Sequence, residues 1–351
     1  MVRDEEGFDY PIVDADRCIE CHKCERVCPF MKLDAPREPQ AVYAACATDE
    51  RLREASSSGG LFTLLAEDTL RRGGVVFGAR FDETWSVCHD YTETIEGLAP
   101  FRGSKYLQSR IGDSYRQAEQ FLKEGRPILF TGTPCQIKGL VHYLGPMVWQ
   151  RYLTTLRAKQ GEIAGISFRD KSVSGWRRYD FVAQMTVHSS GGNVRQFYGD
   201  NIYMRGFLHD LYLRPSCYAC MAKGGRSQSD LTLGDYWGVE RTCPDLDRAL
   251  DEDKGTSVVM IHSERGQSLL EGMSCRYQET NYASALAGNP AIECTAAETP
   301  KRQLFFAQLD AEPLDSLIAR LTVIPLHKRL WRQLHHRAHR VKMRLRRLAR
   351  D

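Results

Sequence analysis

The sequence of 351 residues has no run of about eighteen consecutive apolar residues, the length that a membrane-spanning helix requires. Its first seven residues, Met-Val-Arg-Asp-Glu-Glu-Gly, also lack the apolar stretch of a signal peptide. Internal repeats and low-complexity segments are absent as well. These absences predict a cytoplasmic protein without a spanning helix, and 42% hydrophobic residues are enough for a sizeable core.

Acidic residues are scarce at the end of the chain. From Leu326 onward, ten Lys or Arg residues face one acidic residue, Asp351. This segment therefore carries +9, and since the whole chain carries +3, the first 325 residues carry −6. An acidic body argues against a general nucleic-acid-binding protein.

The same C-terminal stretch carries an apolar stripe at three- and four-residue steps. The stripe consists of Leu330, Leu334, Ala338, Val341, Leu345 and Leu348. We predict that residues 321–351 form a basic amphipathic helix. Its segment 326–350 could bind an anionic membrane surface, where each charge contributes about 1 kcal/mol, or an acidic partner. A solvated or packed terminal helix is the alternative.

Four cysteines near the N-terminus follow the spacing C-x2-C-x2-C-x3-C-P. They are Cys18, Cys21, Cys24 and Cys28, with Pro29 after the last. This spacing is typical of ferredoxin segments that bind a 4Fe–4S cluster. A small cysteine-rich knot is the alternative, but the twelve cysteines of a chain that is not exported favour metal ligands or free thiols. We assign residues 1–36 to a ferredoxin-like segment.

The body, residues 40–320, alternates helix-like and strand-like segments, which predicts a mixed α/β fold. The N-terminal cluster segment and the C-terminal helix flank this body. Helices are expected at 61–70, with serine caps, and at 114–123 and 136–144. Strands are expected at 75–81, 127–130, 231–235 and 257–261. Ligands of such folds favour loops at the carboxyl ends of strands.

Seven short motifs of the body, in order, resemble the beta-subunit family of coenzyme F-420 hydrogenases and dehydrogenases. They lie at 56–60, 102–106, 131–136, 168–176, 217–220, 229–238 and 254–257. The likeness spans residues 5–265 and is closest to the bacterial branch, which fuses a ferredoxin module to the body. This resemblance implies an iron–sulfur flavoprotein that binds FAD and passes electrons between a hydride carrier and clusters.

The chain departs from this family pattern in two places. The first of two ferredoxin runs is absent, so Cys28, which would serve the other cluster in a two-cluster ferredoxin, lacks its usual role. Either Cys28 completes a local site, or Cys46 does, or the true start lies upstream. A Cys-His-Gly segment that the family carries after Pro146 is also missing.

A second cluster site is implied by the resemblance and by three further cysteines. Cys135 follows a strand at an expected helix start, where the helix dipole favours a thiolate. Cys217 and Cys220 form a C-x2-C pair. The three thiolates could hold a 4Fe–4S cluster with a non-protein fourth ligand. Zinc and buried structural cysteines are the alternatives.

The FAD site is expected around the serine–glycine motif, where hydroxyl groups and backbone amides at a helix N-terminus can cradle a phosphate. A solvated basic loop beside an ordinary serine-capped helix is the alternative. The candidate cofactor-binding residues are Ser57, Ser58, Gly59, Gly60, Arg102, Ser104, Lys105, Thr133 and Trp237. Asp235 is a candidate catalytic residue that could bond a flavin or a substrate hydroxyl, and His89 a candidate for proton delivery. A turn aspartate, a core tryptophan and a structural histidine are the alternatives.

Together these features predict an iron–sulfur flavoprotein oxidoreductase. Electrons would come from ferredoxin or another reduced carrier through the N-terminal cluster. Flavin converts between one- and two-electron steps, so FAD beside a cluster suits delivery to a substrate. The competing hypothesis is a non-enzymatic electron-transfer or docking subunit with a degenerate site. A nucleic-acid-associated cluster protein is a third and weaker alternative.

Overall fold

The computed structural model describes residues 2–4, 9–20, 22, 25, 35–107, 109–137, 162–186, 192–227, 229–249 and 253–323. Cys21, Cys24, Cys28 and nearly all of the predicted C-terminal helix lie outside these residues, as does the end of the helix expected at 136–144. The mixed α/β fold is confirmed. Within the described ranges, no helix combines the length and the apolar character needed to cross a membrane.

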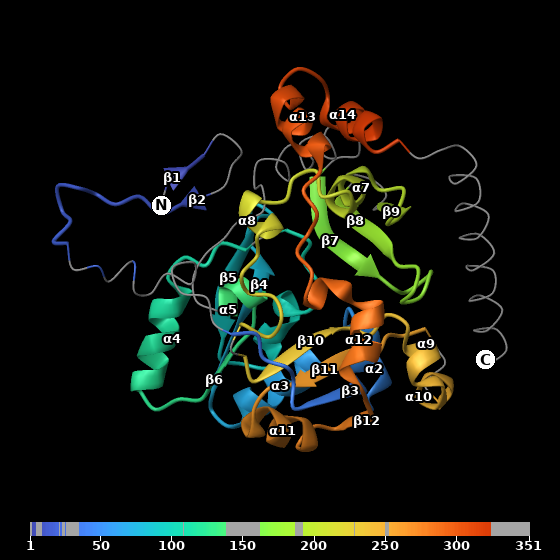
Figure 1. Cartoon of the computed structure of the whole chain (residues 1–351). Helices are drawn as coiled ribbons and strands as arrows, with labels where there is room; N and C mark the ends of the chain where they lie inside the picture. Colours follow the sequence, from blue (N-terminus) through green and yellow to red (C-terminus); the bar gives the residue numbers. More distant parts are fainter. Residues whose placement is uncertain are drawn as a thin grey trace.

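A four-stranded antiparallel sheet, in the order β10-β11-β3-β12, lies in the lower part of the body in Figure 1. Its strands are β3 (Ala41–Ala47), β10 (Leu231–Asp235), β11 (Ser257–Ile261) and β12 (Cys275–Thr280). Residues 257–261 are all buried, as their continuous apolar run predicts. Helix α3 (Leu61–Arg71) packs against this sheet through Leu61, beside Ala45 and Val259.

A second sheet has the order β5-β4-β6. Strand β4 (Val75–Phe81) pairs antiparallel with β5 (Val87–Thr92) and parallel with β6 (Ile128–Phe130). Helix α4 (Ser114–Lys123) covers it, with Phe77 of β4 and Ala118 of α4 in one buried cluster. The predicted helices and strands of this region are therefore confirmed.

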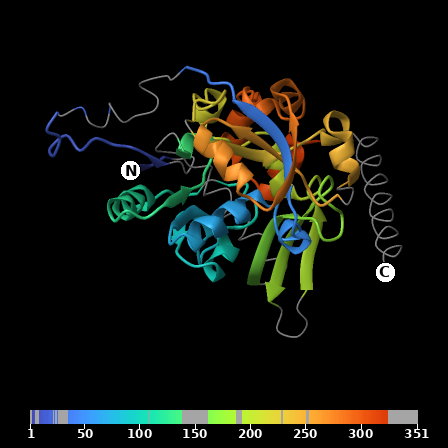
Figure 2. The same cartoon turned by 90° about the horizontal axis from the view of Figure 1, so that it is seen from below.

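A third, antiparallel sheet was not predicted. It joins β7 (Glu162–Asp170), β8 (Asp180–Thr186) and β9 (Gly192–Phe197) in chain order. Its buried Phe168 and Phe181 share a core cluster with Val87 of β5, so the two sheets lie against each other. Figure 2 shows the green β7–β9 sheet beside the blue and teal elements around α3 and β4.

Three helices also contribute to the core cluster that contains Phe168 and Phe181. Leu317 of α14 and Phe305 of α13 are fully buried against Met204 of α7. The bounds are Ile202–Leu208 (α7), Pro300–Gln308 (α13) and Leu314–Leu321 (α14). The remaining elements are β1 (Val2–Arg3), β2 (Asp9–Tyr10), α2 (Glu50–Glu54), η1 (Glu96–Phe101), α5 (Pro134–Ile137), α8 (Pro215–Tyr218), α9 (Val239–Thr242), α10 (Pro244–Ala249), α11 (Glu264–Glu271), α12 (Tyr282–Gly288) and η2 (Pro290–Ile292).

Candidate functional site

Three adjoining cavities lie where the sheets meet, and the segment after η1 joins them. Gly103 and Ser104 line all three. We name them the large cavity (about 970 Å³), the thiol cavity (about 750 Å³) and the small cavity (about 260 Å³). The two larger volumes fall in the range of about 300–1,000 Å³ typical of ligand sites.

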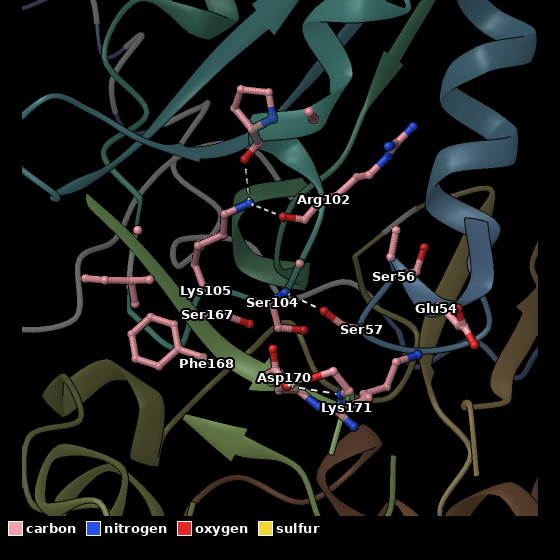
Figure 3. A pocket seen from close by; sticks show the side chains of 18 of the residues that line it. Glu54, Ser56, Ser57, Arg102, Ser104, Lys105, Ser167, Phe168, Asp170 and Lys171 are labelled. Carbon is pink, nitrogen blue, oxygen red and sulfur yellow. Dashed lines mark hydrogen bonds between the residues drawn. The ribbon is translucent and has the colours of Figure 1, made fainter. Parts of the chain in front are cut away.

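The large cavity lies between two walls (Figure 3). One wall is the segment from Glu54 to Ser57 together with residues 102–105, and the other is the end of β7 from Gly165 to Lys171. Phe81 and Trp85 add aromatic surface. The cavity therefore combines a polar, basic rim with an aromatic wall, as a bound cofactor with a charged group and a ring requires.

The serine loop, residues 56–60, is fixed by contacts with residues that are far away in the sequence. The amide of Gly59 donates to Ser257 Oγ at 3.0 Å. A Cβ on Gly59 would lie only 2.5 Å from the carbonyl oxygen of Ala45, so only glycine fits there. The Ser104 amide donates to Ser57 Oγ at 2.6 Å, which joins two of the predicted FAD-binding motifs.

The expected serine cap of α3 is wrong. The N-cap residue is Gly60, at φ +89°, and no side chain accepts a hydrogen bond from the first turn. Ser56 and Ser58 instead donate to the carbonyl oxygens of Leu52 and Thr256, at 2.8 and 3.1 Å. The first N–H groups of α3 thus have no side-chain acceptor, a feature that suits a phosphate.

Two cations at the junction of the cavities retain unused hydrogen-bond donors. Lys105 Nζ donates to the carbonyl oxygens of Pro100 and Arg102, at 2.9 and 2.8 Å, and has a third donor left. No described carboxylate forms an ion pair with it, and burial lowers its pKa to about 7. Arg102 lies 3.8 Å from Glu67, while its buried Nε has no hydrogen-bond partner among the described residues.

Lys171 belongs to the motif at 168–176 but was not predicted as a site residue. In the structure it connects several segments that line the large cavity. Its buried ammonium donates to the carbonyl oxygens of Arg53, Ser58 and Lys254. Burial, followed by the charge of Arg169, lowers its pKa to about 7. All three of its donors are used, so Lys171 ties the serine loop to two other segments. No sequence signal indicates these partners.

The thiol cavity brings together Cys135, Cys217 and Cys220, as predicted, and Thr133 lies beside them. The Thr133 hydroxyl is 3.1 Å from Cys135 Sγ. Burial raises the pKa of Cys135, while hydrogen bonds from the Thr133 side chain and from the backbone amides of Cys135 and Gln136, at the start of α5, lower it. The expectation that the helix start favours the Cys135 thiolate stays a prediction.

Burial also raises the pKa of Cys217, to about 11, and the neighbouring Cys135 and Cys220 raise it further. Without a ligand, Cys135 and Cys217 are therefore stable as thiols. In the part of the chain that the structure describes, no group of three His, Cys, Asp or Glu side chains is close enough to hold a metal ion. Both the second cluster site and the zinc alternative stay predictions.

His89 lines the thiol cavity, but both ring nitrogens are engaged. Its Nε2 donates to the carbonyl oxygen of Thr131 at 2.8 Å, so Nδ1 accepts from the Ser109 hydroxyl at 2.5 Å. Gln136 in turn donates to the Ser109 hydroxyl at 2.8 Å. Burial lowers the pKa of His89, which favours the neutral ring. Its role in proton delivery stays a prediction.

The two remaining candidates, Asp235 and Trp237, both contact Trp176. Asp235 lines the small cavity, forms an ion pair with Arg169 and accepts a hydrogen bond from Trp176 Nε1 at 3.2 Å. Trp237 stacks on Trp176 with ring centroids 4.8 Å apart and lines none of the three cavities. Trp237 is half-buried and packs against two core clusters, and its role in cofactor binding stays a prediction.

The proposed N-terminal cluster segment is described only in part. Cys18 is exposed, and the other three cysteines of the run lie outside the described residues. Cys46 is fully buried within β3, between β11 and β12, and burial raises its pKa. Its position argues against Cys46 as the ligand that completes an exposed cluster.

Comparisons with known proteins agree with these motifs. A family model described as "Coenzyme F420 hydrogenase/dehydrogenase, beta subunit N-term" matches residues 42–113, and its C-terminal counterpart matches residues 125–284. A 4Fe–4S binding domain matches residues 9–30. The chain belongs to the coenzyme F420 hydrogenase/dehydrogenase beta-subunit family. The resemblance inferred from the motifs is thereby confirmed.

Among solved structures, the chain is similar to one in a xenon-derivatised F420-reducing NiFe hydrogenase complex of Methanosarcina barkeri. The identity is 15% and the TM-score 0.46, over 82% of this chain and 94% of the other. No curated protein matches the sequence.

Proposed function

We propose that this family member is an iron–sulfur flavoprotein oxidoreductase. It passes electrons between a reduced carrier, such as ferredoxin, and a substrate, through the N-terminal 4Fe–4S segment and FAD. One observation carries this proposal: Gly103 and Ser104 line both the cavity with the serine loop and the cavity with the three thiols. A flavin site and a second cluster site would then adjoin across a single segment of chain.

The residues around the serine loop fit the pyrophosphate of FAD. Lys105 offers an unused donor, and the buried Arg102 Nε has no hydrogen-bond partner in the described part of the chain, so an anion would satisfy both. Ser57 and Ser104 hold this segment near the N-terminus of α3, whose first turn has no side-chain cap and favours negative charge. Flavin, when bound, supplies conversion between two-electron and one-electron transfer.

The thiol cavity fits a second iron–sulfur cluster. Cys135, Cys217 and Cys220 would be the protein ligands, and metal binding would favour their thiolates over the thiols. The Thr133 hydroxyl beside Cys135 can donate to the sulfur, which is one way in which proteins tune cluster potentials. The hydrogen bonds from His89 through Ser109 to Gln136 hold the loop that carries Cys135.

The content of iron, acid-labile sulfide and FAD in the anaerobically purified full chain tests this function. About eight irons and one FAD per chain would support both cluster sites, and about four irons with FAD would support one cluster and the flavin. Iron without FAD after incubation with FAD would contradict the proposal and favour an electron-transfer or docking subunit. A chain that takes up neither cofactor would contradict both functions.

A further inference from the structure

Arg169 is a buried cation at the edge of the large cavity, near the end of β7. Its side chain is 2% exposed and lines that cavity, while its ion-pair partner Asp235 lines the adjoining small cavity. The pair thus lies between two of the three cavities. Neither the predicted FAD contacts nor the predicted cluster ligands include Arg169.

Two of the donor atoms of Arg169 are unused. Nη1 donates to Asp235 and the Tyr106 phenol lies against the guanidinium, while Nε and Nη2 are buried and have no hydrogen-bond partner among the described residues. A buried N–H group without an acceptor costs about 1–3 kcal/mol. Nε and Nη2 of Arg169 form one fork of the guanidinium and lie beside a cavity. This arrangement indicates a ligand with two neighbouring acceptor atoms.

Two aromatic rings contact the Arg169 guanidinium, and a second cation lies near it. The guanidinium lies 4.6 Å from the ring centre of Tyr179 and 5.3 Å from that of Trp237. The ammonium of Lys171, which hydrogen-bonds only to backbone carbonyl groups, adds a second positive charge nearby. Asp170 and Asp253 also line the large cavity, but they form ion pairs with Arg195 and Arg177, so the two cations still favour negative charge on a bound ligand.

The surroundings of Arg169 suit a ring better than a phosphate. Phe81, Trp85 and Phe168 contribute aromatic surface to the same cavity. The pyrophosphate already has its own partners at the serine loop and residues 102–105. A planar ring that extends from those residues along the aromatic wall would present its polar edge to the fork.

We propose that Arg169 binds the N1 and O2 edge of the isoalloxazine ring and stabilises reduced FAD. This inference rests on the proposed function. Reduction follows FAD + 2 e− + H+ → FADH−, with the electrons supplied by a reduced carrier, and the product bears its negative charge on the pyrimidine part of the ring. A cation at that edge binds the reduced form more tightly than the oxidised form and so raises the reduction potential.

The test compares the dissociation constants of oxidised and dithionite-reduced FAD for the full chain and its variants. Arg169→Gln should lower the preference for reduced FAD at least about tenfold, equivalent to a fall of about 30 mV for a two-electron couple. Arg169→Lys, which keeps the charge and loses the fork, should give a smaller fall. Asp235→Asn, which removes the opposing charge and keeps an acceptor oxygen, should raise the potential.

Arg102→Gln is the matched control, because a residue that binds pyrophosphate should weaken both redox forms equally. If Arg169→Gln also weakens both forms equally, or neither, the inference is wrong although the proposed function stands. A wild-type chain that binds no FAD in either form would instead overturn the proposed function. Circular dichroism of each variant confirms that it is folded, and the opposite signs expected for Arg169→Gln and Asp235→Asn exclude a general loss of structure.

Discussion

Replacing Lys105 by methionine should remove most of the pH dependence of FAD binding. The ammonium has one donor left for a ligand, and no described carboxylate neutralises it. Burial lowers its pKa to about 7, so the free protein loses this proton as the pH rises through neutrality. A bound pyrophosphate favours the protonated form, and FAD must therefore bind together with a proton above pH 7.

The size of the effect follows from the titration. Between pH 7 and pH 9, the protonated fraction of a group with a pKa of about 7 falls from about one half to about one per cent. Because the affinity follows the protonated fraction, FAD binding would weaken by at most about 50-fold across these two pH units. Lys105 is half-buried, so solvent reduces its contribution, and we expect a loss of about tenfold.

The assay is quenching of FAD fluorescence by the flavin-free full chain between pH 6 and pH 9 at constant ionic strength. Lys105→Met should bind FAD more weakly at pH 6, with an almost flat profile. Lys123→Gln removes an exposed lysine that pairs with Glu119, and its profile should match that of the wild type. A wild-type affinity that does not change with pH, or a Lys105→Met profile as steep as the wild type's, would refute the reasoning.

Three further substitutions test other parts of the site. Lys171→Met leaves one buried and two partly buried carbonyl groups without their donor and should lower the free energy of unfolding in urea by about 3 kcal/mol; a loss below about 1 kcal/mol would contradict the assigned clamp. Gly59→Ala places a Cβ 2.5 Å from a carbonyl oxygen of β3 and should weaken FAD binding at least about tenfold, whereas Gly272→Ala, with its nearest atom at 3.5 Å, should not; equal affinities would contradict the fixed loop. Cys217→Ser should remove about four irons per chain, and Cys294→Ser, at an exposed cysteine, should remove none; unchanged iron in Cys217→Ser would exclude that residue as a ligand.

The sequence predicts an element correctly where a strand is wholly buried or where a helix has a regular apolar period. The apolar run 257–261 and the periodic pattern of 61–71 need no tertiary information, and both elements form where they were expected. The β7–β9 sheet was missed because its exposed and buried residues do not alternate regularly. A register shift between Ile163 and Gly165 breaks the two-residue period of β7.

The side-chain partners could not be predicted, because they depend on contacts between distant residues. Trp237 could stack on a ligand or on another side chain, and only the fold places Trp176, 61 positions earlier, against it. The unused donors of Arg169 are a property of its burial, which no spacing reveals. The motif that begins at Phe168 identified this segment as part of the site, but the hydrogen-bonding state of Arg169 depends on how the segment packs.

The central claim is that flavin and the second cluster exchange electrons across the segment around Ser104. The most direct measurement is anaerobic photoreduction of the FAD-loaded, cluster-containing full chain, followed by electron paramagnetic resonance of the cluster and absorbance of the flavin. We predict that the flavin loses electrons to the cluster within milliseconds, and that Cys217→Ser abolishes this step while FAD remains bound. A wild-type chain that holds both cofactors, yet keeps its flavin reduced beside an oxidised cluster, would contradict the account.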